Sequence, residues 1–350
     1  MVNWFSLISK ASKKKEDVHR MTRIQLTLAC GEYDRTNALA LADVVPEGID
    51  LNYLRLPVEE TFWRMLRHRE FDCAEMSLSS YLMHRSRSDD FIALPVFPSR
   101  CFRHSCIFIH KGSGIRRPED LAGKRVGVPE YQMTAPLWQR ALLQHDYGVP
   151  PSAIQWFQGG LEQPGREEKE RLNLPSDVTI QPIKPEQTLN QMLATGEIDA
   201  LLSARAPSSF SSSQQEPVAR LFPDFKRVEQ GYFRRTAIFP IMHVVVLRND
   251  VVERYPWVGG SLYKAFCQAK DRLFKLMAQT AALHLSLPWL IDELEETQHL
   301  MGADFWPYGV VANRKTLDAA TQYSHEQGLT PRKFAVEELF LPSTLDAFKI

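Results

Sequence analysis

Three residues in one short segment carry side chains that suit the binding and protonation of an anion. Arg100, Arg103 and His104 come just before an apolar run at 106–110. Guanidinium groups bind carboxylates through paired hydrogen bonds, and a histidine donates a proton near neutral pH. The alternative is surface charge at a strand start, with a histidine hydrogen-bonded at a domain edge. We expect the two arginines to bind an anion and His104 to serve as an acid.

A second histidine interrupts the apolar run at 241–247, which reads IMHVVVL. His243 must find a partner if it is buried, because an unpaired polar group in a core is costly. It therefore faces either a cleft or a core pocket that satisfies it. If His243 and His104 share a cleft, one can act as the acid while the other receives a proton.

Glu130, Tyr131 and Thr134 lie in the loop and first turn of a helix expected at 134–146. Backbone N–H groups at a helix N-terminus, together with the Thr134 hydroxyl, favour an anion. Simple helix capping is the alternative role of Thr134. Glu130 would repel an anionic ligand, so we expect it to be a base or the ion-pair partner of an arginine.

A segment that occurs twice indicates how these side chains are positioned. Residues 59–72 follow the pattern E-x-T-x-x-x-M-L-x-x-x-E-x-D, and the same pattern returns at 186–199. Each copy predicts a helix, a tight turn and a strand that ends in a polar loop, and hence two similar lobes. Ligands of open α/β sheets lie at the carboxyl ends of strands, so the loops at 77–80 and 203–205 should face each other across a cleft.

Four further side chains are assigned to this cleft by their position at expected strand ends. Ser77 and Ser79 follow the first copy, and Arg205 follows the second. Tyr33 belongs to the equivalent loop after the first expected strand.

Strands alternate with helical stretches along the chain, which predicts an α/β fold with largely parallel sheets. We expect a flexible tail at 1–20, one lobe made of 21–112 plus 240–350, and a second lobe at 113–239. Strands near 106–110 and 241–247 should be the two crossovers, and such a hinge lets the lobes close on a ligand. The expected strands are 24–30, 51–56, 73–76, 93–97, 125–128, 154–157, 179–183 and 200–203, and the expected helices are 134–146, 256–279, 288–301 and 314–327.

Composition narrows the class of protein. The 350 residues carry 42 basic and 42 acidic side chains, so we expect no nucleic-acid partner, because binding to a polyanion needs a basic surface. Five cysteines without CxxC spacing favour a reducing compartment, and no zinc spacing is present. We see neither a secretory signal nor a membrane span. A cytoplasmic protein is therefore expected, and a homo-oligomer stays open.

Several stretches together resemble a known family. The segment 114–149 (GIRRPEDLAGKRVGVPEYQMTAPLWQRALLQHDYGV), with IQWFQGG at 154–160 and TLNQMLATGEIDALLSA at 188–204, is similar to the type II periplasmic-binding-protein fold. CGEYDRT, FPSRCFRHS, FPIMHVVV and WPYG then resemble the 4,5-dihydroxyphthalate decarboxylase family. The resemblance covers about residues 21 to 348. It implies a two-lobed α/β fold with a cleft between the lobes and two crossover strands.

The resemblance also implies a reaction. 4,5-Dihydroxyphthalate would lose one carboxylate to give protocatechuate and CO2 without an organic cofactor. Deprotonation of the ring hydroxyl para to the leaving group pushes electrons onto the carboxylated carbon, which a general acid then protonates. Cations must hold the two carboxylates. The expected catalytic residues are His104, His243 and Glu130, and the expected substrate-binding residues are Arg100, Arg103, Arg205, Tyr131, Thr134, Ser77, Ser79 and Tyr33.

Two alternatives compete with this interpretation. Proteins of the same fold bind many ligands without catalysis, so the chain could be the solute-binding protein of an ABC transporter for a small carboxylated ligand. That function needs export, for which we see no signal. The other alternative is a different cytoplasmic enzyme on the same fold, acting on another carboxylated molecule.

Overall fold

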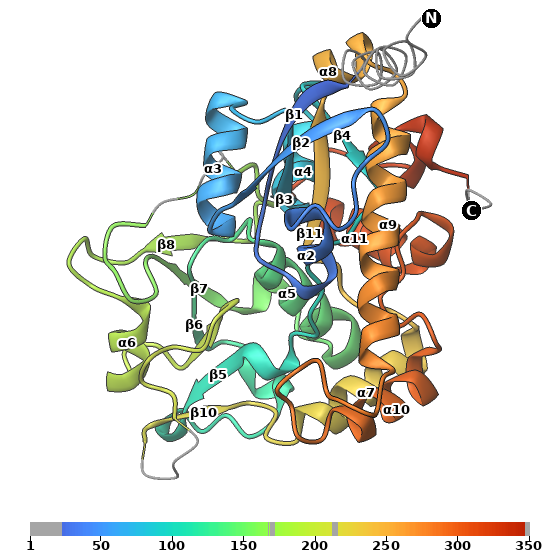
Figure 1. Cartoon of the computed structure of the whole chain (residues 1–350). Helices are drawn as coiled ribbons and strands as arrows, with labels where there is room; N and C mark the ends of the chain where they lie inside the picture. Colours follow the sequence, from blue (N-terminus) through green and yellow to red (C-terminus); the bar gives the residue numbers. More distant parts are fainter. Residues whose placement is uncertain (1–22, 167, 169–171, 212–215, 347–350) are drawn as a thin grey trace, which may run out of the picture.

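Two mixed β-sheets, each flanked by helices, form the two lobes of the protein (Figure 1). The computed structural model describes residues 23–166, 168, 172–211 and 216–346, so the predicted tail at 1–20 lies outside the described residues. In the first sheet only β11 runs antiparallel to its neighbours. Its strands, in spatial order, are β2 (Ile49–Arg55), β1 (Ile24–Cys30), β3 (Cys73–Ser77), β11 (His243–Arg248) and β4 (Phe91–Leu94).

The strands of the second sheet are arranged in the same way as those of the first, with one additional strand at an edge. β6, β7, β8 and β9 are parallel, and β5 enters antiparallel between β9 and β10. Its strands, in spatial order, are β10 (Val218–Arg220), β5 (Ile107–His110), β9 (Ala200–Leu202), β6 (Arg125–Val128), β7 (Gln155–Gln158) and β8 (Ile180–Pro182). β1 and β3 of the first lobe therefore correspond to β6 and β9 of the second.

The duplicated segment forms the same unit in both lobes. The first copy folds into α3 (Val58–His68) and leads into β3, and the second folds into α6 (Leu189–Thr195) and leads into β9. Its final aspartate accepts a backbone N–H from the neighbouring parallel strand each time. Asp72 Oδ2 lies 2.8 Å from Thr27 N, and Asp199 Oδ2 lies 2.9 Å from Arg125 N.

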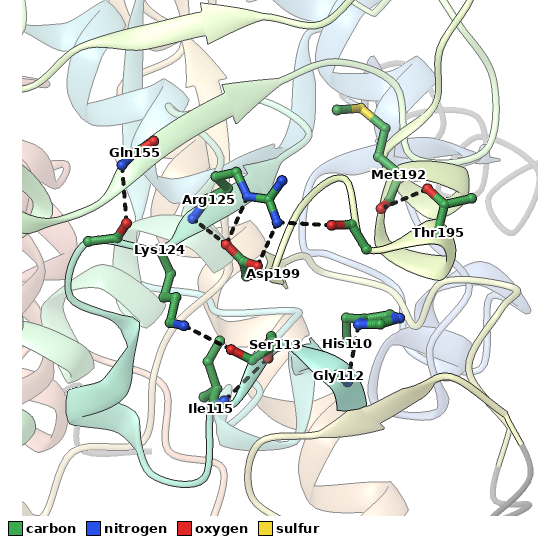
Figure 2. A network of polar contacts seen from close by, with 12 residues as sticks. His110, Gly112, Ser113, Ile115, Lys124, Arg125, Gln155, Met192, Thr195 and Asp199 are labelled. Atoms are coloured by element: carbon green, nitrogen blue, oxygen red, sulfur yellow. Dashed lines mark hydrogen bonds and ion pairs between the residues drawn. The ribbon is translucent and has the colours of Figure 1, made fainter.

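Unlike its counterpart Asp72, Asp199 also binds a side chain, that of Arg125. The Arg125 guanidinium donates to both carboxylate oxygens, at 3.0 Å and 2.8 Å, and to the Gly196 carbonyl at 2.9 Å (Figure 2). This network closes the tight turn between α6 and β9. The repeat therefore supplies scaffold, which is why its pattern is dominated by helix, turn and strand positions.

Two antiparallel segments join the lobes. Cys101 N donates to Pro240 O at 3.1 Å and Met242 N donates to Ser99 O at 2.8 Å, so the two crossings lie side by side. The prediction placed the crossings in the strands at 106–110 and 241–247. In the structure the paired segments are 99–101 and 240–242, so the first precedes its predicted strand and the second overlaps the start of its predicted strand. β5 belongs wholly to the second sheet, whereas the predicted boundary at 112 left it with the first lobe.

Most long helices agree with their predicted ranges. Gly148 ends α5 (Thr134–Tyr147) in the left-handed conformation (φ 68°), which glycine adopts readily. The sequence did not predict α4 and α7; α4 begins where a polar loop was expected at 77–80. Among the described residues, no helix has the length and apolarity needed to cross a membrane. The remaining helices are α2 (Asn37–Ala40), α4 (Leu78–Arg85), α5 (Thr134–Tyr147), α7 (Phe225–Thr236), α8 (Asn249–Arg254), α9 (Val258–Met277), α10 (Leu290–Met301) and α11 (Arg314–Glu326).

Candidate active site

A cavity of about 150 Å³ lies between the lobes and brings together side chains from both. We call it the interlobe cavity. The first lobe contributes α3, the end of β3, the first turn of α4 and the start of β11. The second contributes the loop before α5, the start of α5 and the loop after β9, and the crossings contribute Arg103 and Met242. Its lining residues are Val58, Glu59, Phe62, Ser77, Ser80, Arg103, Glu130, Gln132, Met133, Thr134, Ala135, Ala204, Arg205, Met242 and His243.

Two helices begin at this cavity. Ser77 directly precedes α4, and Thr134 is the first residue of α5. The Thr134 hydroxyl does not cap its own helix. It lies 2.8 Å from Ser77 Oγ and 3.1 Å from Ser79 Oγ, and it accepts the Ser79 N–H at 3.0 Å. These contacts join the lobes. They leave the partial positive charge of both helix N-termini directed at the cavity.

His243 reaches the cavity from the first residue of β11. Its Nδ1 lies 2.6 Å from Oε1 of Glu75, a fully buried residue of β3, and Phe62 packs edge-on against its ring. Because Nδ1 is engaged by Glu75, the nitrogen that remains for a ligand is Nε2. Glu75 was missed at the sequence level. The signal was available, since a carboxylate in the apolar strand CAEMS demands a buried partner.

Arginine side chains supply the positive charge of the cavity. Arg103 donates to the Ala204 carbonyl at 3.2 Å and contacts the Met242 sulfur at 3.1 Å, which holds the guanidinium against the cavity wall. Arg205 stands at the mouth, and its side chain is 67% exposed. Its nearest acidic group is Glu59 of α3, at 3.5 Å. Both arginines are placed to meet a carboxylate that enters from the mouth.

Glu130 is the buried acid of the second lobe. Its Oε1 accepts from Arg166 Nε at 2.6 Å, and its Oε2 accepts from Gln132 Nε2 at 3.2 Å. Arg166 also lies 3.7 Å from Glu59, so a chain of alternating charge runs across the cavity. Arg166 was not predicted from the sequence, because nothing local marks it as the partner of an acid that precedes it by a whole helix and strand.

Comparisons with known proteins decide the family. A 4,5-dihydroxyphthalate decarboxylase from Comamonas testosteroni is 40% identical over 331 residues, which cover 94% of this chain and the whole of that protein. A second protein of that name, from Pseudomonas putida, is 41% identical over 215 residues, covering 61% of this chain and 83% of its own length. The chain belongs to the 4,5-dihydroxyphthalate decarboxylase family. No family model matches the chain.

Membership of this decarboxylase family confirms the predicted family and the class of carboxy-lyases. The predicted fold is confirmed as well. The periplasmic aliphatic sulphonate binding protein SsuA from Escherichia coli superposes with a TM-score of 0.51 at 14% identity, covering 92% of this chain and 98% of that one. At this identity the likeness concerns the fold alone.

Arg100 does not line the cavity of this decarboxylase-family protein. Its buried guanidinium donates to the Pro307 carbonyl at 2.9 Å and to Asn313 Oδ1, and it lies over the ring of Phe239. Burial lowers the pKa of Arg100 to about 9. The structure therefore gives Arg100 a structural role between a crossing and the C-terminal segment, in place of the predicted contact with substrate.

His104 is also remote from the cavity. It is buried between Phe222 and Tyr232, with Glu229 3.9 Å from Nδ1. Burial, with a smaller contribution from Arg235, lowers the pKa of His104 to about 4. Of the two predicted histidines, His243 lines the interlobe cavity and His104 does not.

Two predicted tyrosines lie behind the cavity wall. Tyr131 is fully buried under Arg140, whose guanidinium carbon is 3.6 Å from the ring centroid. Tyr33 donates its hydroxyl to Glu75 Oε1 at 2.7 Å and so touches the partner of His243. Of the predicted site residues, those that line the cavity are His243, Glu130, Arg103, Arg205, Thr134 and Ser77, while Ser79 bonds to Thr134 just beneath it.

A larger hollow of about 940 Å³ is lined by Arg166, which bonds to Glu130 of the interlobe cavity. Its lining includes Ile180 and Pro182 of β8. None of the predicted site residues lines it. We place the candidate active site in the smaller cavity because an acid, a histidine, arginines and two helix N-termini converge there.

Proposed function

We propose that this protein decarboxylates a hydroxylated aromatic dicarboxylate, with 4,5-dihydroxyphthalate as substrate and protocatechuate and CO2 as products. Two relatives that bear this enzyme's name support the substrate. The observation that carries the reaction is the interlobe cavity, where Arg103, His243 and Glu130 meet. An anion-binding group, a proton donor and a proton acceptor are the three groups that this chemistry requires.

The two adjacent carboxylates bind to the cationic side of the cavity. Arg103 presents a guanidinium that can hold a carboxylate through paired hydrogen bonds, and Arg205 lies at the mouth to receive the other. The N-terminus of α5 at Thr134 adds a partial positive charge and a hydroxyl. These groups orient the ring before the reaction and stabilise the negative charge that moves through it.

Glu130 accepts the proton of the hydroxyl para to the leaving carboxylate. The electron pair of the phenolate moves into the ring, and the carboxylated carbon takes a proton from Nε2 of His243. The bond to CO2 then breaks, its electrons restore the aromatic ring, and Glu130 returns its proton to the phenolate. One proton is consumed for each CO2 released. Lobe closure over the cavity excludes water during these steps.

The decisive experiment is CO2 release by the purified protein from 4,5-dihydroxyphthalate, without added metal or cofactor. A panel of hydroxylated benzoates and phthalates identifies the substrate class. Turnover of the dihydroxylated phthalate supports the proposal. Binding without turnover supports the solute-binding alternative, and turnover of another carboxylated ring alone supports a different enzyme on this fold.

A further inference from the structure

A carboxylate in the middle of β3 is the most completely bonded buried charge near the cavity. Four donors fill the lone pairs of Glu75. His243 Nδ1 and the Tyr33 hydroxyl meet Oε1 at 2.6 Å and 2.7 Å, while Gly31 N and Cys30 Sγ meet Oε2 at 2.8 Å and 3.4 Å. A buried carboxylate bonded in this way is fixed in position, because any displacement of the group lengthens at least one of the four contacts.

The chemical state of each partner follows from these contacts. Burial raises the pKa of Glu75, but the charge and hydrogen bond of His243, the Gly31 N–H and the Tyr33 hydroxyl outweigh it, and the pKa lies below its usual value. An ionised carboxylate only accepts hydrogen bonds, so Nδ1 of His243 must carry a proton. Burial and the charge of Glu75 raise the pKa of Tyr33, which keeps its proton and donates it.

The absence of a side chain at Gly31 allows the Tyr33 hydroxyl to approach Glu75. A Cβ added there would lie 2.9 Å from the Tyr33 ring and 3.0 Å from Val58. A side chain at this position would push Tyr33 away from Glu75. The glycine therefore lets both its own N–H and the Tyr33 hydroxyl reach the same carboxylate.

The second lobe shows that the fold does not need this carboxylate. Three residues after the aspartate of the repeat, the first lobe has Glu75 and the second has Leu202, at equivalent places in β3 and β9. Tyr33 also has a counterpart, because E-Y-x-x-T occurs after β1 at 32–36 and after β6 at 130–134. Among the described residues the buried Tyr131 hydroxyl finds no hydrogen-bond partner. The second lobe therefore folds with a leucine at the position where the first lobe buries a carboxylate.

We propose that Glu75 and Tyr33 are positioning residues that hold His243 as the proton donor of the interlobe cavity. Glu75 sets which ring nitrogen faces the cavity and stabilises the imidazolium, and Tyr33 holds Glu75 in place. The inference rests on the proposed function for the use of the proton, whereas the array itself rests on geometry. The other charged side chains that line the cavity with His243 are Glu59, Arg103, Glu130 and Arg205.

The test uses three variants of the full chain. Glu75→Gln keeps the size of the side chain and removes its charge. Tyr33→Phe removes one hydroxyl from the array. Tyr53→Phe is the matched control, because the Tyr53 hydroxyl lies 3.2 Å from Gly31 O and 3.0 Å from Thr36 Oγ1, in the same region but without a hydrogen bond to Glu75. Two readouts are needed: NMR titration of the His243 ring without substrate, and kcat and KM across pH.

We expect Glu75→Gln to lower kcat by about 10- to 100-fold with little change in KM, since misorienting the donor forfeits part of a general-acid contribution of about 10²–10⁴. The alkaline limit of kcat and the titration midpoint of His243 should both move to lower pH, because a neutral amide no longer stabilises the imidazolium. Tyr33→Phe should lower kcat by about 2- to 10-fold, a smaller part of the same contribution because Gly31 still holds Glu75. Tyr53→Phe should match the wild type.

An unchanged His243 titration and pH profile in Glu75→Gln would overturn the inference, as would equal losses in the two tyrosine variants. If Glu75→Gln fails to fold, the comparison of Tyr33→Phe with Tyr53→Phe decides. Failure of the proposed function looks different. The wild type would then release no CO2 from any substrate of the panel, while the NMR titration would still show whether Glu75 controls His243.

Discussion

Replacing Glu59 with glutamine tests how the mouth of the interlobe cavity selects its ligand. Glu59 Oε1 lies 3.5 Å from Arg205 Nη2 and 3.7 Å from Arg166 Nη2. Glu59 belongs to α3 of the first lobe, and both arginines belong to the second. One carboxylate oxygen thus bridges the lobes at the proposed entrance for a substrate carboxylate.

The bridge is weak enough for a ligand to displace. Both distances exceed the ~3.2 Å limit of a good hydrogen bond, and the Glu59 side chain is 38% exposed. Exposed pairs of this kind contribute about 0.2–1 kcal/mol each, so the two together contribute at most about 2 kcal/mol. A substrate carboxylate that binds Arg205 at hydrogen-bond distance forms a stronger contact. It must also overcome repulsion from Glu59.

We therefore expect Glu59→Gln to bind phthalate about 2- to 10-fold more tightly, because roughly 0.5–1.4 kcal/mol of competition and repulsion is removed. Phthalate is chosen because it carries both carboxylates and no hydroxyl to deprotonate. Isothermal titration calorimetry measures the Kd, and the gain should shrink at high salt as the exposed charges are screened.

The neighbouring residue provides the control for this measurement. Glu60 pairs with Arg64 on the outer face of α3 at 2.8 Å and does not line the cavity, so Glu60→Gln should leave the Kd unchanged. Weaker phthalate binding by Glu59→Gln would refute the reasoning, since it would show that Glu59 assists the ligand. Equal effects of the two variants would show that only net charge matters.

Four further outcomes follow from the structure. Arg103→Lys keeps the charge but loses the planar fork, so KM should rise about 10-fold with the melting temperature nearly unchanged. Arg100→Lys should lower the melting temperature and leave KM close to the wild type, because Arg100 bonds to buried carbonyls away from the cavity. Asp199→Asn should lower the free energy of unfolding in urea by about 1.5–3 kcal/mol through loss of the charged bonds to Arg125, with kcat retained. Between pH 6.5 and about 4, His104 is protonated in the unfolded chain but stays neutral in the folded protein, because its folded-state pKa is lowered. The free energy of unfolding therefore falls as the pH falls. His104→Met should remove about 2 kcal/mol of the difference between pH 7 and pH 5 in urea unfolding, and an unchanged difference would contradict the assigned burial.

Local pattern was enough for most of the scaffold. The strand predicted at 24–30 coincides with β1, and the helices predicted at 134–146 and 314–327 match α5 and α11 within a residue. Apolar runs and helical periodicity in the sequence indicate these elements, and Gly148 marks the end of α5. α7 was missed because its sequence, FKRVEQGYFRRT, is polar overall and buries little beyond Tyr232.

The site was only partly predictable because its partners are far apart in sequence. His104 and His243 looked equivalent, since each precedes or opens an apolar strand. The two histidines differ in their surroundings. Aromatic rings enclose His104, whereas His243 bonds to Glu75, which lies 168 positions earlier in the chain. A sequence shows that a buried charge needs a partner, but not which distant residue meets it.

The two lobes offer an internal test of which residues belong to the scaffold. The E-Y-x-x-T segment occurs in both, yet Glu32 is exposed beside Arg55 at 3.5 Å, whereas Glu130 is buried and bonded to Arg166 at 2.6 Å. Positions that serve the fold keep their role in both copies, as Asp72 and Asp199 do with a neighbouring strand. Among the positions that change charge or burial between the copies, Glu130 lines the interlobe cavity and Glu75 bonds to His243, which also lines it. Divergence between the copies thus points to the same cavity as the candidate active site, without reference to any relative.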